Sequence, residues 1–200
     1  GIGAHPGERA EGARARHEEL DVAKLRQQMA PVGPIAPIGL LVVPNAIVVS
    51  GDAAATAASI RESGELLRLG IATDLVHQVI GIFLVLALYR LFKPVNESLA
   101  RQLVVLGALV SVPIVFFNTL NYLAALSLTS GADFLSVFGK PELDALAYLF
   151  MRLHAQGLTV ASVFWGLWLF PFGLLAIRSG FIPPVFGYLL FIAGFGYLAS

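Results

Sequence analysis

Six polar side chains that could do chemistry lie inside stretches that are otherwise apolar. They form three groups that are close in sequence: Asp74 with His77, Asn118 with Asn121, and Arg152 with His154. Polar residues inside membrane-spanning helices are rare and by default mark functional sites. Members of the first two groups are three residues apart, so each pair would share one helix face. We therefore take these six residues as candidate ligand-binding residues.

The depth of these groups along their helices predicts that they meet. At about 1.5 Å per residue, all six lie roughly 9–20 Å from the same end of their helices. The opposite halves are almost purely hydrocarbon, as in IFLVLAL, VVLGALV and FGLLAI. We expect one polar cluster in the outer half of a helix bundle, with Asp74 and Arg152 forming an ion pair. A charge left unpaired there would cost about 3–5 kcal/mol.

Three roles for the cluster stay open at this point. Polar groups between membrane helices often only hold the helices together, and this is the role we favour; Asn118 and Asn121 are typical of it. A ligand or ion path ranks second, and catalysis ranks last. Asp74, His77 and His154 could supply three metal ligands, but two histidines from different helices are a weak signal. No catalytic residue, metal or cofactor is therefore predicted.

The composition is that of a membrane protein. Of the 200 residues, 57% are hydrophobic and only 13% are charged, whereas soluble domains carry about 25% charged residues. A soluble domain of this size could not bury that much apolar surface. The net charge is zero and no basic cluster is present, so no nucleic-acid partner is expected. The lipid bilayer is the predicted partner.

Four long apolar segments would position the polar residues. A spanning helix needs roughly 20 residues, and the segments of about that length or more lie at 66–92, 99–128, 143–177 and 181–200. The expected fold class is therefore all-α: a polytopic transmembrane helix bundle with four spans in residues 66–200. Before it we expect a polar, flexible N-terminal segment at 1–37 and an interfacial, extracytoplasmic segment at 38–65. In the second of these, Asp52 would cap a short helix over 53–60.

Basic residues predict the orientation of the bundle. Arg90, Lys93 and Arg101 crowd one short link between two spans, and Arg178 lies on the same side. Short loops rich in Lys and Arg usually face the cytoplasm. Residues on the opposite side, including the loop at 129–142, would then face outside.

Six short motifs follow one another along the chain. They are VVPNAIVVSGDAAATAASI at 42–60, LLRLG at 66–70, KPVN at 93–96, SGADFL at 130–135, LHAQG at 153–157 and RSGFIP at 178–183. In this order they resemble a bacterial multi-pass membrane family catalogued as domain of unknown function 4386. The resemblance covers roughly residues 38–200 and implies about six spans in the cell membrane, without an established activity. It also implies one span just before Gly39 and another after Ser200.

The functional prediction is an integral membrane protein of unknown activity. One alternative is a transporter or binding bundle for a small molecule or ion, using the outward polar cluster. A second is an accessory or sensor protein that acts through helix contacts, for which a second copy of the chain is a candidate partner. We do not expect an enzyme. A pocket around the cluster would favour the first alternative, and tight packing without a cavity would favour the second.

Overall fold

The computed structural model describes residue 39 and residues 42–199. The predicted flexible segment at 1–37 lies outside these residues. The described part is helical, with no strand. Its elements are α3 (Val43–Ile47), α4 (Ala53–Glu62), α5 (Gly64–Phe92), α6 (Glu97–Val104), the π-helical η1 (Val105–Val110), α7 (Ser111–Leu128), the 3-10 helix η2 (Asp133–Leu135), α8 (Lys140–Arg178) and α9 (Pro184–Ala199).

Three helical rods are long and apolar enough to cross a membrane. They are α5, the continuous rod from α6 through η1 to α7, and α8. Their starts lie two or three residues before the predicted ones, so the first three apolar segments are confirmed as helices. The fourth, α9, has 16 residues, or about 24 Å at 1.5 Å per residue. That is less than the roughly 30 Å of a hydrocarbon core, so the described residues contain three candidate spans and the predicted four are not confirmed.

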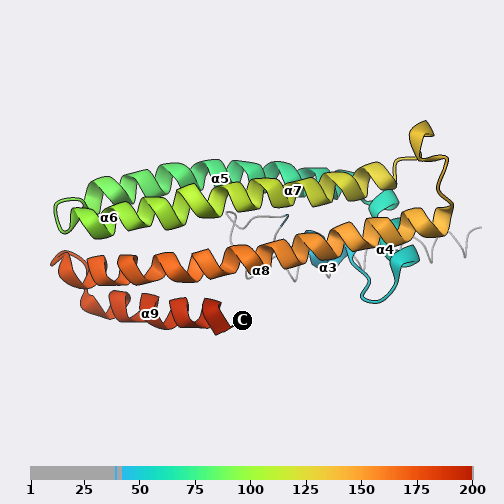
Figure 1. Ribbon diagram of the computed structural model, residues 1–200. Coiled ribbons are helices and arrows are strands. Elements are labelled where there is room, and N and C mark those ends of the chain that lie inside the picture. The colour runs from blue at the N-terminus through green and yellow to red at the C-terminus, as the bar shows by residue number, and fades with distance from the viewer. Residues whose placement is uncertain (1–38, 40–41, 200) are drawn as a thin grey trace, which may run out of the picture.

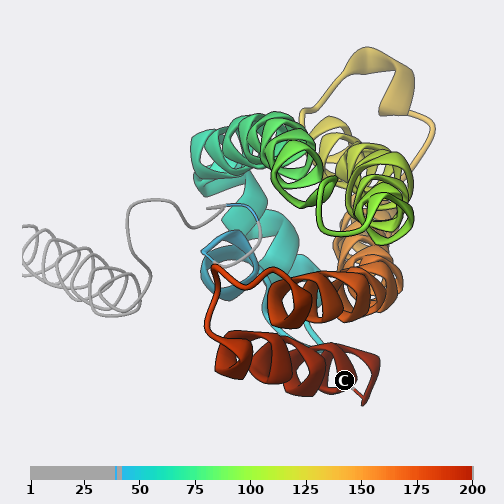
Figure 2. The ribbon, with the colours of Figure 1, turned by 90° about the vertical axis from the view of Figure 1, so that its left-hand side faces the viewer.

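The helices run up and down in two layers. Figure 1 shows α5 beside the α6–α7 rod in one layer, and α8 beside α9 in the other. The closest packing is between α8 and α9 and between α7 and α8. Seen end-on, the helices follow an arc in the order α5, α7, α8 and α9 (Figure 2).

Short polar signals set the helix ends. The Asp52 side chain accepts a hydrogen bond from the backbone N–H of Ala55 at 2.8 Å, so the predicted cap of α4 is confirmed. Asn96 caps α6 in the same way, through the N–H of Leu99 at 2.9 Å. Both caps satisfy amide groups that have no partner within the helix.

The π-helical η1 lies just before Pro113. Proline has no N–H, and its ring crowds the carbonyl of the residue four positions earlier. A wider helical turn next to Pro113 removes that crowding, and the hydroxyl of Ser111 donates to the carbonyl of Leu106 at 2.8 Å within it. The widened turn also brings Gly107 against Trp168 of α8, because a Cβ at Gly107 would meet that ring at 2.9 Å.

Two apolar cores fill opposite ends of the bundle. We name the two ends after the predicted orientation: the inner core, near the α5–α6 turn, holds buried Phe92, Leu103 and Leu175. The outer core joins α3, α4, α5, α7 and α8, and its buried residues are Val43, Ile47, Ile60, Leu67, Ile71, Tyr122, Ala125, Ala147 and Met151. Between these ends, large apolar side chains such as Phe117, which is 73% exposed, cover the outward faces. Such surfaces suit lipid rather than water.

Candidate functional site

Two hydrogen bonds join α7 to α8 at the level of Asn118 and His154. The Asn118 side-chain amide donates to the backbone carbonyl of His154 at 2.9 Å. In return, Nδ1 of His154 lies 3.2 Å from the backbone carbonyl of Asn118. A carbonyl oxygen can only accept, so Nδ1 carries the proton and Nε2 of the neutral ring is an acceptor. The pair therefore works as a reciprocal brace between two helices.

Tyr122 extends this brace toward the outer end of the bundle. Its ring stacks on the His154 ring with centroids 3.5 Å apart and an angle of 15° between the planes. Its hydroxyl donates to the carbonyl of Gly39 at 3.1 Å. Tyr122 thus connects the α7–α8 brace to the segment that precedes α3.

Asp74 of α5 also lies against Gly39. Its side chain is buried, and a Cβ added at Gly39 would collide with its carboxylate. A Cβ at Gly70, one turn earlier on α5, would meet the Cα of Gly39 at 3.0 Å. Because glycine has no side chain, these two positions let the backbone near Gly39 lie directly against α5 and its carboxylate.

Asn121 completes a line of polar groups across three helices. It is half-buried, and its amide donates to the side-chain oxygen of Asn118 at 2.9 Å. Gly157 on α8 leaves the space that Asn118 occupies, because a Cβ there would collide with the amide. We call Asp74, Asn118, Asn121, Tyr122 and His154 the outer polar cluster.

The structure places two of the six predicted residues elsewhere. His77 and Arg152 are both exposed on the outsides of their helices. Arg152 stands two positions from His154, and residues two apart on a helix do not face each other. The predicted ion pair between Asp74 and Arg152 is not among the ion pairs of the described residues.

One hydrogen-bond acceptor of the cluster, on His154, has no donor among the described residues. Nε2 of His154 is fully buried, with no hydrogen-bond partner among the described residues. Buried polar atoms usually have one, so such an atom needs an explanation. An N–H or O–H group entering the cluster would satisfy it, whereas a second acceptor would not. The cluster is therefore suited to a group that donates hydrogen bonds.

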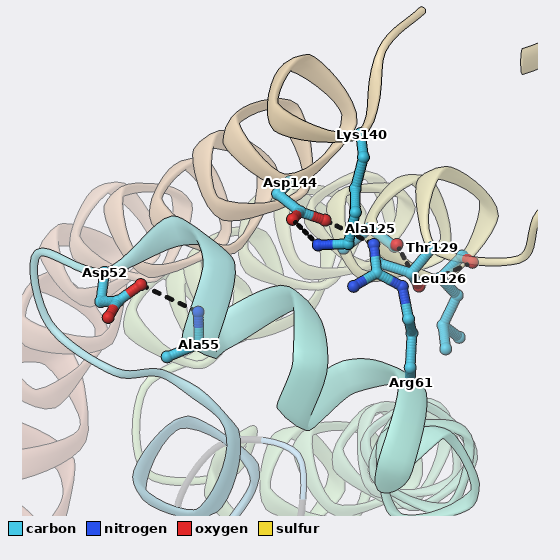
Figure 3. A network of polar contacts seen from close by, with 8 residues as sticks. All are labelled: Asp52, Ala55, Arg61, Ala125, Leu126, Thr129, Lys140 and Asp144. Carbon is cyan, nitrogen blue, oxygen red and sulfur yellow. Dashed lines mark hydrogen bonds and ion pairs between the residues drawn. The ribbon is translucent and has the colours of Figure 1, made fainter. Parts of the chain in front are cut away.

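A second polar group lies at the outer end of the helices. Asp144 of α8 is almost fully buried, and its carboxylate pairs with Arg61 of α4 and, at 2.5 Å, with Lys140. Figure 3 shows the two cations approaching from different elements, Arg61 from the end of α4 and Lys140 from the first turn of α8. Beside them, the Thr129 hydroxyl donates to the Ala125 carbonyl at the end of α7. This group ties α4 to the long helix.

No group of three or more His, Cys, Asp or Glu residues that could hold a metal ion occurs in the part of the chain that the structure describes.

A family model described as "Domain of unknown function (DUF4386)" matches residues 34–200. The chain belongs to this family. The match includes every helix described above, and so confirms the resemblance seen in the sequence motifs. No curated protein and no solved structure matches the chain.

Sequence reasoning missed Tyr122, Gly39, Asp144 and Arg61. Tyr122 could have been found, because it lies four positions after Asn118 and hence on the same helix face. Arg61 and Asp144 are 83 positions apart, and no periodicity links them. Their contact depends on how α4 folds back over the bundle.

Proposed function

We propose that this chain is an integral protein of the bacterial cell membrane that binds a small hydrogen-bond-donating molecule at the outer polar cluster. The observation that carries the proposal is the buried Nε2 acceptor of His154, which is linked to the Asp74 carboxylate through Tyr122 and Gly39. A carboxylate favours a cation nearby. A protonated amine supplies both the positive charge and the N–H donors, so we take small amines as the favoured ligand class.

The proposal includes an orientation of the helix bundle in the membrane. We take α9 as a fourth span and the α5–α6 turn as cytoplasmic, because that turn carries the crowded basic residues. The α7–α8 loop would then face outside, and so would the polar cluster. The chain contains no cysteine, so single cysteines can report this directly.

The orientation is tested with a membrane-impermeant maleimide on intact cells. Ser136→Cys, in the α7–α8 loop, should be labelled from outside, and Ser98→Cys, in the first turn of α6 beside the α5–α6 turn, should be labelled only after lysis. Both positions are exposed. Ala199→Cys, at the end of α9, should be labelled from outside if α9 crosses the membrane. The reverse pattern at 136 and 98 would overturn the orientation.

Ligand binding is tested by thermal stabilisation of the purified protein with a panel of small amines, carboxylic acids and neutral polyols. We expect amines to raise the melting temperature of the native chain. His154→Gln and Asp74→Asn should lose the response, whereas His77→Gln should keep it, because His77 is exposed away from the cluster. A response that His154→Gln retains would place the ligand elsewhere.

A second candidate is an accessory protein that acts through helix contacts. It is favoured by the reciprocal Asn118–His154 brace, which binds two helices without any ligand. If no member of the panel stabilises the native chain, this second candidate replaces the first.

A further inference from the structure

The helix α4 covers the outer end of the bundle. It packs against α8, α5 and α7. In the end-on view of Figure 2, the teal α4 lies across the space between α5 and α8. Its residues Thr56, Ala57 and Ile60 are buried against these helices. The short helix thus closes the side of the bundle toward which the polar cluster lies.

Apolar packing lies between α4 and His154 of the polar cluster. Ile60 of α4 belongs to the outer core together with Tyr122 and Met151. Tyr122 stacks on His154, and Met151 precedes His154 by three residues, or about one turn of α8. A ligand arriving at His154 from the outer end would have to displace this layer, and α4 with it.

The ion pair that holds α4 to α8 is built so that it can open. Asp144 is 4% exposed in its side chain, and besides Arg61 it pairs with Lys140, four positions earlier on the same helix. Releasing Arg61 therefore leaves the buried carboxylate with a cation, which avoids the large cost of a lone buried charge. Arg61 itself is already 34% exposed, so its guanidinium can return to water easily.

At each end of α4 the chain leaves regular helical geometry. Gly51, just before it, has φ of +80°, a conformation that glycine adopts readily and other residues rarely do. The Gly51 N–H donates to the Tyr148 hydroxyl of α8 at 2.9 Å. At the other end, Ser63 departs from helical geometry between α4 and α5. Residues 51–63 thus contact α8 through the Gly51–Tyr148 hydrogen bond and the Arg61–Asp144 ion pair, and α4 is flanked on both sides by non-helical residues.

We propose that α4 is a lid over the outer polar cluster, held shut by a releasable ion pair between Arg61 and Asp144. Opening of the lid would admit the small molecule to the acceptor at His154. The purpose of the lid rests on the ligand binding proposed above. Its opening can be measured without any ligand.

The test follows the reactivity of one thiol placed beneath the lid. Ala147 is fully buried in the outer core, to which Ile60 of α4 also belongs. Ala100 is equally buried in the inner core, far from α4 in the fold. Because the native chain has no cysteine, Ala147→Cys and Ala100→Cys each carry a single thiol. The labelling rates of both are measured with a soluble maleimide in detergent.

Each thiol is combined with changes in the ion pair. We expect Arg61→Gln to speed labelling at position 147 about tenfold or more, the effect of losing one charge-assisted hydrogen bond on a local opening equilibrium. Labelling at position 100 should not change. Lys140→Gln should leave position 147 slow, because it keeps the Arg61 contact, and Arg61→Lys should restore much of the protection.

The outcomes separate a lid from general loosening. Equal acceleration at 147 and 100 after Arg61→Gln would mean that the whole bundle had loosened, and would overturn the proposal. No acceleration at 147 would overturn it as well. If the lid opens as expected but no amine stabilises the protein, the ligand-binding proposal fails and the proposal that α4 opens is retained.

Discussion

The packing of α9 on α8 yields the sharpest prediction, because the two backbones touch through glycine. A Cβ at Gly187 of α9 would meet the backbone oxygen of Gly173 of α8 at 2.6 Å and collide with the side chain of Ile177. A Cβ at Gly173 would meet the backbone oxygen of Gly187 at 2.8 Å. Backbone atoms cannot swing aside as a side-chain tip can. We therefore expect Gly187→Ala to push α9 away from α8.

The size of the effect follows from two opposing terms. Overpacking a well-packed site costs about 1–3 kcal/mol, while replacing glycine by alanine inside a helix returns about 1 kcal/mol. The net change for Gly187→Ala is then a loss of about 0–2 kcal/mol in the free energy of unfolding. Gly81→Ala is the matched control, since a Cβ at Gly81, within α5, would have nothing within 4 Å. The two variants should differ by about 1–3 kcal/mol.

The assay is denaturation in mixed detergent micelles, followed by tryptophan fluorescence. Trp165 of α8 lies edge-on to Tyr197 of α9, with ring centroids 6.3 Å apart, so its emission reports on this contact. Gly187→Ala should shift the folded-state emission as well as the midpoint, and Gly81→Ala should do neither or raise the midpoint. Equal stability of the two variants would refute the claim that the backbones of α8 and α9 are in contact.

Two further predictions concern the inner core and the lid. Phe92→Ala should lower the free energy of unfolding by about 3–5 kcal/mol, because the ring is fully buried and its removal leaves a cavity. Phe117→Ala, at a 73% exposed position, should lower it much less in the same denaturation assay. Equal losses would contradict the assignment of the core. Asp52→Ala removes the cap of α4 and should cost about 1 kcal/mol. Its effect should show as faster hydrogen exchange confined to α4, whereas faster exchange throughout the bundle would argue against a local role.

The helices were predictable because their signals are local. The first three apolar segments, the cap at Asp52 and the breaks between spans each depend on a few adjacent residues, and the structure agrees with them to within three positions. The length of α9 was overestimated, because the turn at 178–183 and its Gly180, with φ of +73°, take the first residues of the apolar run.

The site was predictable only in part, because depth along a helix is easier to infer than direction around it. The depth estimate correctly predicted that Asn118 and His154 lie at the same level of the bundle. The predicted direction of Arg152 was wrong, because this residue lies two positions from His154 and therefore does not share its helix face. Residues three apart also differ by about 60° around the axis, enough to leave His77 exposed while Asp74 is buried.

Some contacts had a sequence signal that periodicity alone could not interpret. Gly166 and Gly173 on α8 are seven apart, as are Gly187 and Gly194 on α9, and the two pairs meet face to face. The equal spacing is visible in the sequence, but the pairing of these two helices is a property of the fold. The Arg61–Asp144 contact has no such signal.

The unbroken length of α8 has a mechanical consequence. At 39 residues it is about 58 Å long, and it carries Asp144 near one end, His154 part-way along and the glycines that seat α9 toward the other. A rod of this kind transmits a tilt along its whole length: a rotation of about 5° about the level of His154 would carry the far end roughly 3 Å sideways. A change in the contact between α4 and the near end of α8 would therefore also displace the far end of α8, and α9, which packs against that end, would move with α8.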